Sequence, residues 1–153
     1  MKKILILLIA FVFFCCNSDD QYRELNSTHD ISTEISVFND QNEDLLNPNN
    51  FNHLDFSKIK LFYVIDGVSH DYTTQLDLVK RENEYRINML LNDIDKSEKK
   101  VMYIQWNEND RDTIEFTIKA YKNLYKPNTI WFNNKVVWQF TCGICGAEFK
   151  IIK

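Results

Sequence analysis

The stretch Thr113-Ile114-Glu115-Phe116-Thr117-Ile118-Lys119-Ala120 alternates polar and apolar side chains without a break. In an extended chain, successive side chains point to opposite faces, so the apolar residues would all lie on one face and the polar residues on the other. This alternation is typical of a strand half buried against a core. It does not fit an amphipathic helix, whose apolar positions recur every three or four residues. The stretch therefore predicts a β-strand.

The same period of two recurs before and after this stretch, and no segment of ten or more residues keeps the apolar spacing of a helix. Asp66-Gly67 and Asn133-Asn134 lie between such runs, as residues of tight hairpin turns do. The pattern predicts an all-β fold, an antiparallel two-sheet sandwich with an immunoglobulin-like topology as one candidate and a small closed β-barrel as the alternative. The other alternating runs are 31–37, 59–65, 85–91, 102–106, 129–132, 135–140 and 148–152.

The N-terminus has a different character. Lys2 and Lys3 precede an unbroken apolar run from Ile4 to Phe14. A positive segment followed by a short apolar segment is the pattern of a secretory signal peptide. The eleven apolar residues are fewer than the roughly 20 that a membrane-spanning helix needs. We therefore interpret this segment as a targeting signal.

The end of the apolar run resembles the lipobox of bacterial lipoproteins, in which a small residue precedes a cysteine that is acylated and becomes the mature N-terminus. Cys16 follows the small Cys15, whereas Cys15 itself follows the bulky Phe14. The resemblance implies that residues 1–15 are the signal peptide and that lipid on Cys16 anchors the chain to a membrane without spanning it.

The next residues, Asn17-Ser18-Asp19-Asp20, resemble the acidic export signal of lipoproteins from Bacteroidota, and the composition is also similar to that of many uncharacterised lipoproteins of that phylum. The resemblance implies that Ser18, Asp19 and Asp20 direct the protein to the outer face of the outer membrane. The periplasmic face is the alternative location, and a solvated acidic spacer is the alternative interpretation of these residues.

Removal of residues 1–15 would leave one domain-sized chain. We expect residues 16–30 to be a flexible tether and residues 31–153 to form the sandwich domain. The mature chain would keep all 22 acidic residues and lose Lys2 and Lys3, giving a formal charge of −6. A net acidic chain with no basic run longer than two residues is a poor candidate for binding nucleic acid.

No motif for catalysis or for cofactor binding is evident. The three histidines, His29, His53 and His70, are scattered, and the three glycines are too few to form a phosphate-binding loop. The loop 39–52 starts like a calcium-binding EF-hand loop but has Leu45 and Phe51 where that loop needs glycine and glutamate. We therefore expect no enzymatic activity, no catalytic residue, no cofactor and no metal site.

Two tryptophans suggest a binding surface. If Asn133-Asn134 form a two-residue turn, Trp131 pairs with Val136 and Thr129 pairs with Trp138. Trp131 and Trp138 would then be diagonal neighbours on one face of the hairpin. That face could pack on the core or form a platform for an extracellular ligand or an envelope protein.

The segment Thr141-Cys142-Gly143-Ile144-Cys145-Gly146 holds both cysteines that would remain beside the lipidated one. Its spacing is compatible with a disulfide, with a dithiol redox site or with half of a zinc site. Two hypotheses about function follow. The preferred one is a non-enzymatic surface lipoprotein that binds a partner, and the alternative is a periplasmic thiol or metal protein that uses Cys142 and Cys145.

We expect Cys142 and Cys145 to be joined by a disulfide, because exported cysteines enter an oxidising compartment. The closed ring would be small, so replacing both cysteines by serine should cost about 2 kcal/mol at most and lower the melting temperature modestly. Intact-mass measurement with and without reductant, followed by thermal melts, checks both statements. Stoichiometric zinc or two reactive thiols in the purified protein would contradict them.

Overall fold

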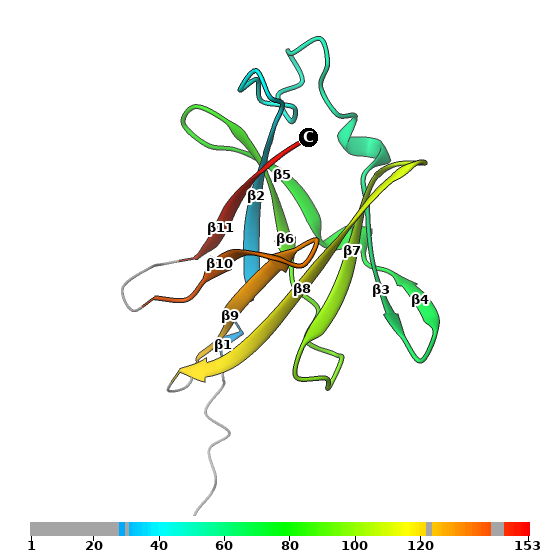
Figure 1. Ribbon diagram of the computed structural model, residues 1–153, viewed down its shortest axis with the longest axis vertical. Coiled ribbons are helices and arrows are strands. Elements are labelled where there is room, and N and C mark those ends of the chain that lie inside the picture. Colours follow the sequence, from blue (N-terminus) through cyan, green and yellow to red (C-terminus); the bar gives the residue numbers. More distant parts are fainter. Residues whose placement is uncertain (1–27, 30, 122–123, 142–145) are drawn as a thin grey trace, which may run out of the picture.

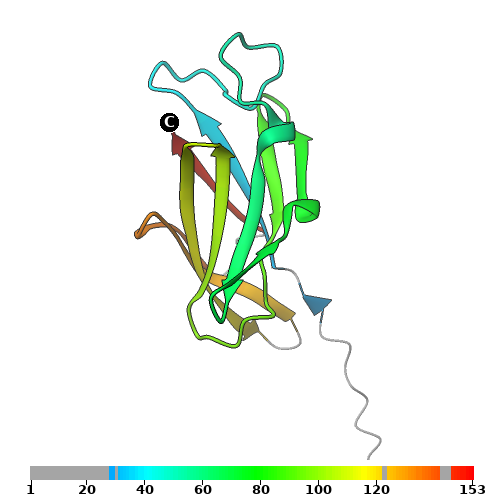
Figure 2. The same ribbon diagram turned by 90° about the vertical axis from the view of Figure 1, so that its right-hand side faces the viewer.

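The computed structural model describes residues 28–29, 31–121, 124–141 and 146–153. These residues form two packed β-sheets (Figures 1 and 2). One sheet has seven strands, in the order β1-β9-β8-β7-β3-β4, with β10 also pairing with β9; the other has four strands, in the order β11-β2-β6-β5. The sheets do not close into a barrel, so the predicted sandwich is confirmed and the barrel alternative is wrong.

The strands are short, apart from those at the centre of the larger sheet. That sheet contains β1 (Thr28–His29), β3 (Lys60–Ile65), β4 (Val68–Asp71), β7 (Lys100–Asn107), β8 (Asp110–Tyr121), β9 (Leu124–Phe132) and β10 (Lys135–Gln139). The smaller sheet contains β2 (Ser32–Phe38), β5 (Leu76–Lys80), β6 (Tyr85–Leu90) and β11 (Ala147–Ile152). Two single-turn helices, η1 (Phe56–Lys58) and η2 (Thr73–Gln75), lie in the connections.

The strands from β2 to β8 follow the order of an immunoglobulin domain. In those domains, strands B, E and D lie side by side in one sheet, and strands C′, C, F and G lie side by side in the other. Here β2-β6-β5 and β4-β3-β7-β8 reproduce both rows, with every pair antiparallel. β9 and β10 extend the larger sheet beyond this arrangement.

Three features differ from the sequence expectations. β11 lies parallel to β2, from Ala147 opposite Thr33 to Ile152 opposite Phe38, so the smaller sheet is not wholly antiparallel. β1 lies inside the segment 16–30 that we expected to be a tether, and it pairs with β9. β5 was not among the predicted runs. Its Leu76 and Leu78 pair with Met89 and Ile87 of β6.

Both predicted hairpin turns are present. Asp66 and Gly67 have φ angles of 53° and 77°, and Asn133 and Asn134 have φ angles of 48° and 65°. Two successive residues with positive φ define the type I′ turn, whose twist matches that of the strands it joins. Glycine adopts this conformation without steric cost, and asparagine and aspartate tolerate it better than most residues.

The core lies between the two sheets and is built by alternate side chains. In β8, for example, Ile114 and Phe116 are fully buried while their neighbours Thr113 and Glu115 reach the other face. The alternation predicted for this strand is therefore confirmed. The largest fully buried side chains are Trp106, Phe116, Ile35, Leu46, Ile59, Leu61, Ile87, Met89, Leu91, Met102, Ile104 and Ile114.

The loop between β2 and η1 uses its polar side chains to hold its own shape. The Asn39 Oδ1 atom accepts backbone hydrogen bonds from Gln41 (3.0 Å) and Glu43 (2.8 Å). The buried carboxylate of Asp44 accepts one from Leu46 and one from Tyr85 of β6, both at 2.8 Å. Among the oxygens that resemble calcium ligands in the sequence, Asn42 Oδ1 accepts a hydrogen bond from Lys150 (2.8 Å), and those of Asp44 anchor the loop to β6.

A polar cluster joins the two sheets at the C-terminal end of β11. Lys153 donates its backbone N–H to Phe38 of the smaller sheet (2.8 Å), and its ammonium group lies 2.8 Å from the carboxylate of Asp112 in β8. Asp112 also accepts hydrogen bonds from Trp106 Nε1 and Asn133 Nδ2, both at 2.6 Å. Burial alone would raise the pKa of Asp112, but these hydrogen bonds and the nearby ammonium group outweigh it and lower the pKa.

We predict that Asp112→Asn destabilises the domain by about 1–3 kcal/mol at neutral pH, because asparagine replaces one of the two accepting oxygens by an NH2 donor and removes the negative charge beside Lys153. A lowered folded-state pKa gives stability that is complete above the unfolded-state value of about 3.9 and is lost as the pH falls through the folded-state value. In Asp112→Asn, the free energy of unfolding should lack the part of its pH dependence that Asp112 contributes.

Urea unfolding between pH 3 and pH 7 checks the prediction, with Asp40→Asn as an exposed control. Equal acid dependence in wild type and Asp112→Asn would contradict the assignment.

Candidate functional site

Most of the site residues predicted from the sequence lie outside the described part of the chain. These are the lipidation residue Cys16, the export-signal residues Ser18, Asp19 and Asp20, and the pair Cys142 and Cys145. Next to the cysteine pair, Gly146 is described and has a φ of 82°, a conformation that a residue with a Cβ rarely adopts. The expectations for the six residues stay predictions.

The two tryptophans do not form the expected pair. Trp131 lies opposite Val136 as predicted, but the register shifts before Trp138, which lies opposite Ile130 instead of Thr129. Because Ile130 is fully buried, Trp138 packs against the core, and Val137 does so as well. A bulge, in which two residues of one strand oppose one of the other, produces such a shift. The expected placement of Trp131 and Trp138 on one face of the hairpin is therefore wrong, and Trp138 takes the alternative position, packed on the core.

Trp131 lies on the outer face of the larger sheet, where charged groups already contact it. Its neighbour across the strands is Glu115. The ammonium group of Lys99 lies 4.6 Å from the centre of the Trp131 ring and 2.8 Å from Glu115 Oε2. The cation near this ring is thus neutralised within the protein.

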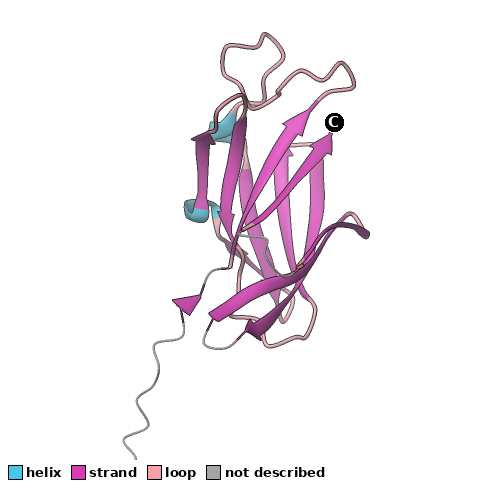
Figure 3. Ribbon diagram, turned by 90° about the vertical axis from the view of Figure 1, so that its left-hand side faces the viewer, coloured by secondary structure: helices cyan, strands magenta, loops and turns pink. Residues whose placement is uncertain are grey.

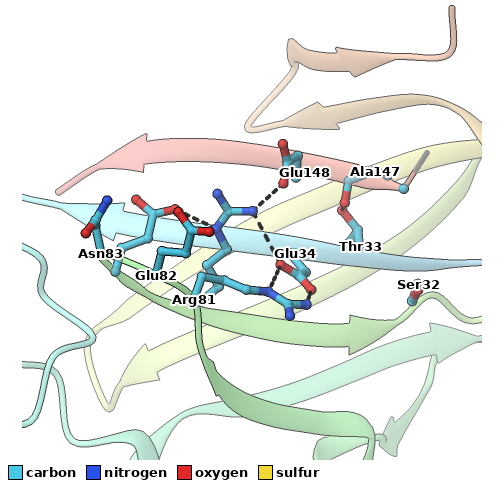
Figure 4. A pocket seen from close by; sticks show the side chains of 11 residues that line it. Ser32, Thr33, Glu34, Arg81, Glu82, Asn83, Ala147 and Glu148 are labelled. Carbon is cyan, nitrogen blue, oxygen red and sulfur yellow. Dashed lines mark hydrogen bonds and ion pairs between the residues drawn. The ribbon is translucent and has the colours of Figure 1, made fainter. Parts of the chain in front are cut away.

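A hollow of about 660 Å³ lies over the outer face of the smaller sheet. Figure 4 shows Glu34 of β2 beside Arg81, with Glu148 of β11 on the neighbouring strand. Arg86 of β6 and Glu84 of the β5–β6 turn complete the cluster. We call these five charged residues the ionic groove.

The charges of the ionic groove largely neutralise one another, since two guanidinium groups pair with three carboxylates. Arg81 holds both oxygens of Glu34, and the Nε atom lies 3.0 Å from Oε2. Arg86 bonds to Glu84, Glu148 and Glu34. The hydrogen bond from Arg81 is the main reason why the pKa of Glu34 is lowered. Burial alone would lower the pKa of Arg86, but its carboxylate partners raise it.

In this arrangement Glu34 is unsuited to the role of a general acid. A general acid needs a carboxyl pKa raised towards the working pH, whereas Glu34 is held in its ionised form. In the described part of the chain, no group of three or more His, Cys, Asp or Glu side chains is placed to hold a metal ion. The ionic groove instead fastens β11, β2, β6 and the β5–β6 turn to one another.

A second surface, which the sequence analysis missed, lies on the outer face of the larger sheet. Phe62 of β3 and Tyr103 of β7 lie side by side in the register, and their rings stack with centres 5.2 Å apart. The guanidinium of Arg111 in β8 lies 5.7 Å and 5.5 Å from the two ring centres. We call these three residues the aromatic platform. The sequence signal for this surface was the run of three consecutive apolar residues at 61–63, which places apolar side chains on both faces of the strand.

Comparisons with known proteins provide no functional assignment. No family model matches the chain, and neither the curated proteins nor the solved structures contain a significant match. Within the described residues, no helix has the length and apolar character that crossing a membrane requires.

We predict that Arg86→Gln destabilises the protein by about 1 kcal/mol, because it leaves Glu84 and Glu148 without their cation. The loss should shrink at high salt, which screens the remaining repulsion between carboxylates. Denaturant unfolding at low and high ionic strength measures it.

Arg81→Gln is the matched control. Its side chain is 52% exposed, so its loss should destabilise the protein less. An equal or larger effect of Arg81→Gln would show that Arg86 is not the centre of the groove.

Proposed function

We propose that this protein is a lipid-anchored module, exposed at the surface of the outer membrane, that binds an extracellular ligand or an envelope protein and catalyses no reaction. The observation that carries the binding function is the aromatic platform. Phe62 and Tyr103 lie on the outer face of the larger sheet and are only partly buried. Aromatic side chains beside an arginine that has no carboxylate partner in the described part of the chain have the composition typical of a recognition surface.

The ionic groove supports a non-enzymatic function. Its carboxylates and guanidinium groups compensate one another, and the lowered pKa of Glu34 disfavours proton donation near neutral pH. The alternative, a thiol or metal function at Cys142 and Cys145, stays a prediction from the sequence, because both residues lie outside the described part of the chain.

The fold is compatible with an anchor at the N-terminus. β1 lies at one end of the sandwich, whereas the loop between β2 and η1 and the end of β11 lie at the other (Figures 1 and 3). Eleven residues lie between Cys16 and Thr28, and a chain of that length spans up to about 40 Å when extended. An anchor at Cys16 could therefore hold the whole domain clear of a membrane surface.

We expect Cys16→Ala to abolish lipid attachment and leave an uncleaved or soluble precursor. Mass spectrometry of the mature N-terminus and fractionation of the cells measure this directly. A lipid-free N-terminus elsewhere in the wild-type chain would rule out the anchor.

The surface location is tested separately with the double variant Asp19→Ala/Asp20→Ala. This variant should remain lipidated and folded, but it should become protected from protease added to intact cells. Unchanged protease sensitivity would reduce these acids to a solvated spacer.

A further inference from the structure

We propose that the aromatic platform binds an acidic saccharide, with a sugar ring packed against Phe62 beside its stacked partner Tyr103 and a sugar carboxylate held by Arg111. The proposal rests on the binding function proposed above and names its ligand class.

The platform is directed away from the core by the register of three strands. Phe62 lies between Leu61, which is fully buried, and Tyr63, which is nearly so, and Tyr103 lies between the fully buried Met102 and Ile104. Because successive side chains of a strand point to opposite faces, Phe62 and Tyr103 must lie on the outer face. Their outward position follows from the same alternation that builds the core.

Arg111 supplies a charge that is available to a ligand. In the described part of the chain, no carboxylate forms an ion pair with Arg111, in contrast to Arg81 and Arg86 in the ionic groove. Its distances to the two rings are close to the limit of about 6 Å for cation–π attraction. A ligand carboxylate can therefore bind the guanidinium at little cost. The planar guanidinium can donate two parallel hydrogen bonds to its two oxygens.

An open hollow of about 400 Å³ adjoins Phe62 and Arg111. This volume is at the lower end of the range of small-molecule sites, about 300–1,000 Å³. Its polar lining consists of Lys60, Ser69, Asp71 and Gln105. The positive charge of Lys60 lies close enough to the carboxylate of Asp71 to interact with it, so Arg111 is the lining cation without a carboxylate partner among the described residues. Asp71 is partly engaged by the backbone N–H of Thr73, at 2.8 Å.

The combination of these groups favours one ligand class. The C–H face of a pyranose ring packs on flat aromatic rings, and its hydroxyls need donors and acceptors such as Gln105 and Ser69. Arg111 selects a ligand with negative charge. An extended peptide would instead gain most from the free backbone groups of a sheet edge, which the platform does not offer.

The test measures binding of the full-length protein, purified in detergent, to oligosaccharides of uronic acids from polygalacturonate, alginate and hyaluronan, by calorimetry. Highly methyl-esterified polygalacturonate is the matched ligand control, since it keeps the sugar backbone and loses the charge. We expect binding to at least one acidic oligosaccharide, weakened about tenfold or more by Arg111→Gln and by Phe62→Ala. Binding should also weaken as salt is raised.

Arg81→Gln is the control variant, because it removes the same charge from the other sheet. It should bind like wild type, and melting temperatures should verify that every variant is folded. The proposal is overturned if none of the acidic oligosaccharides binds, if the esterified polymer binds equally well, if Arg111→Gln binds like wild type, or if polyglutamate competes as effectively as the saccharide. Each of these results leaves the anchor at Cys16 and its own test unaffected.

Discussion

The burial of every second side chain between two sheets is the constraint on which the rest of this structure depends. It requires Leu61, Met102, Ile104, Ile114 and Phe116 to face inward, where all five are fully buried. The same periodicity then obliges Phe62, Tyr103 and Arg111 to face outward. The core and the proposed binding surface are thus two faces of the same strands. A shift of one residue in register would exchange them.

The two sheets are also joined by contacts that come from the end of the chain. β11 pairs with β2, and Lys153 then reaches across to Asp110 and Asp112 of the larger sheet. On the outer face of the smaller sheet, Arg86 connects β6 to Glu148 of β11. These polar groups are largely compensated by one another, so we assign them to holding the sandwich together. The cation of the aromatic platform has no such compensation among the described residues, which is why we assign that surface to a ligand.

The sequence predicted those features of the fold that depend only on residues close to one another in the chain. The alternation in β8 and the turns at Asp66-Gly67 and Asn133-Asn134 follow from side-chain period and from the φ preferences of neighbouring residues. The bulge before Trp138 could not be predicted from the sequence. The hairpin is apolar on both faces, so its hydrophobic pattern permits either register.

Features built by distant residues were not predictable in this way. The parallel pairing of β11 with β2 joins positions more than a hundred residues apart, as in the hydrogen bond from Thr33 to Ala147. The ionic groove and the aromatic platform likewise assemble from separate strands. Their members are ordinary strand and turn residues in the sequence until the topology places them together.

The central claim is that the outer face of the larger sheet is the binding face and that the ionic groove is structural. Nuclear magnetic resonance mapping of backbone amides during titration with an acidic oligosaccharide tests this claim most directly. The account predicts shifts that concentrate at Phe62, Tyr103 and Arg111 and leave Glu34, Arg81 and Glu148 unchanged. Shifts centred on the ionic groove, or none at saturating ligand, would contradict it.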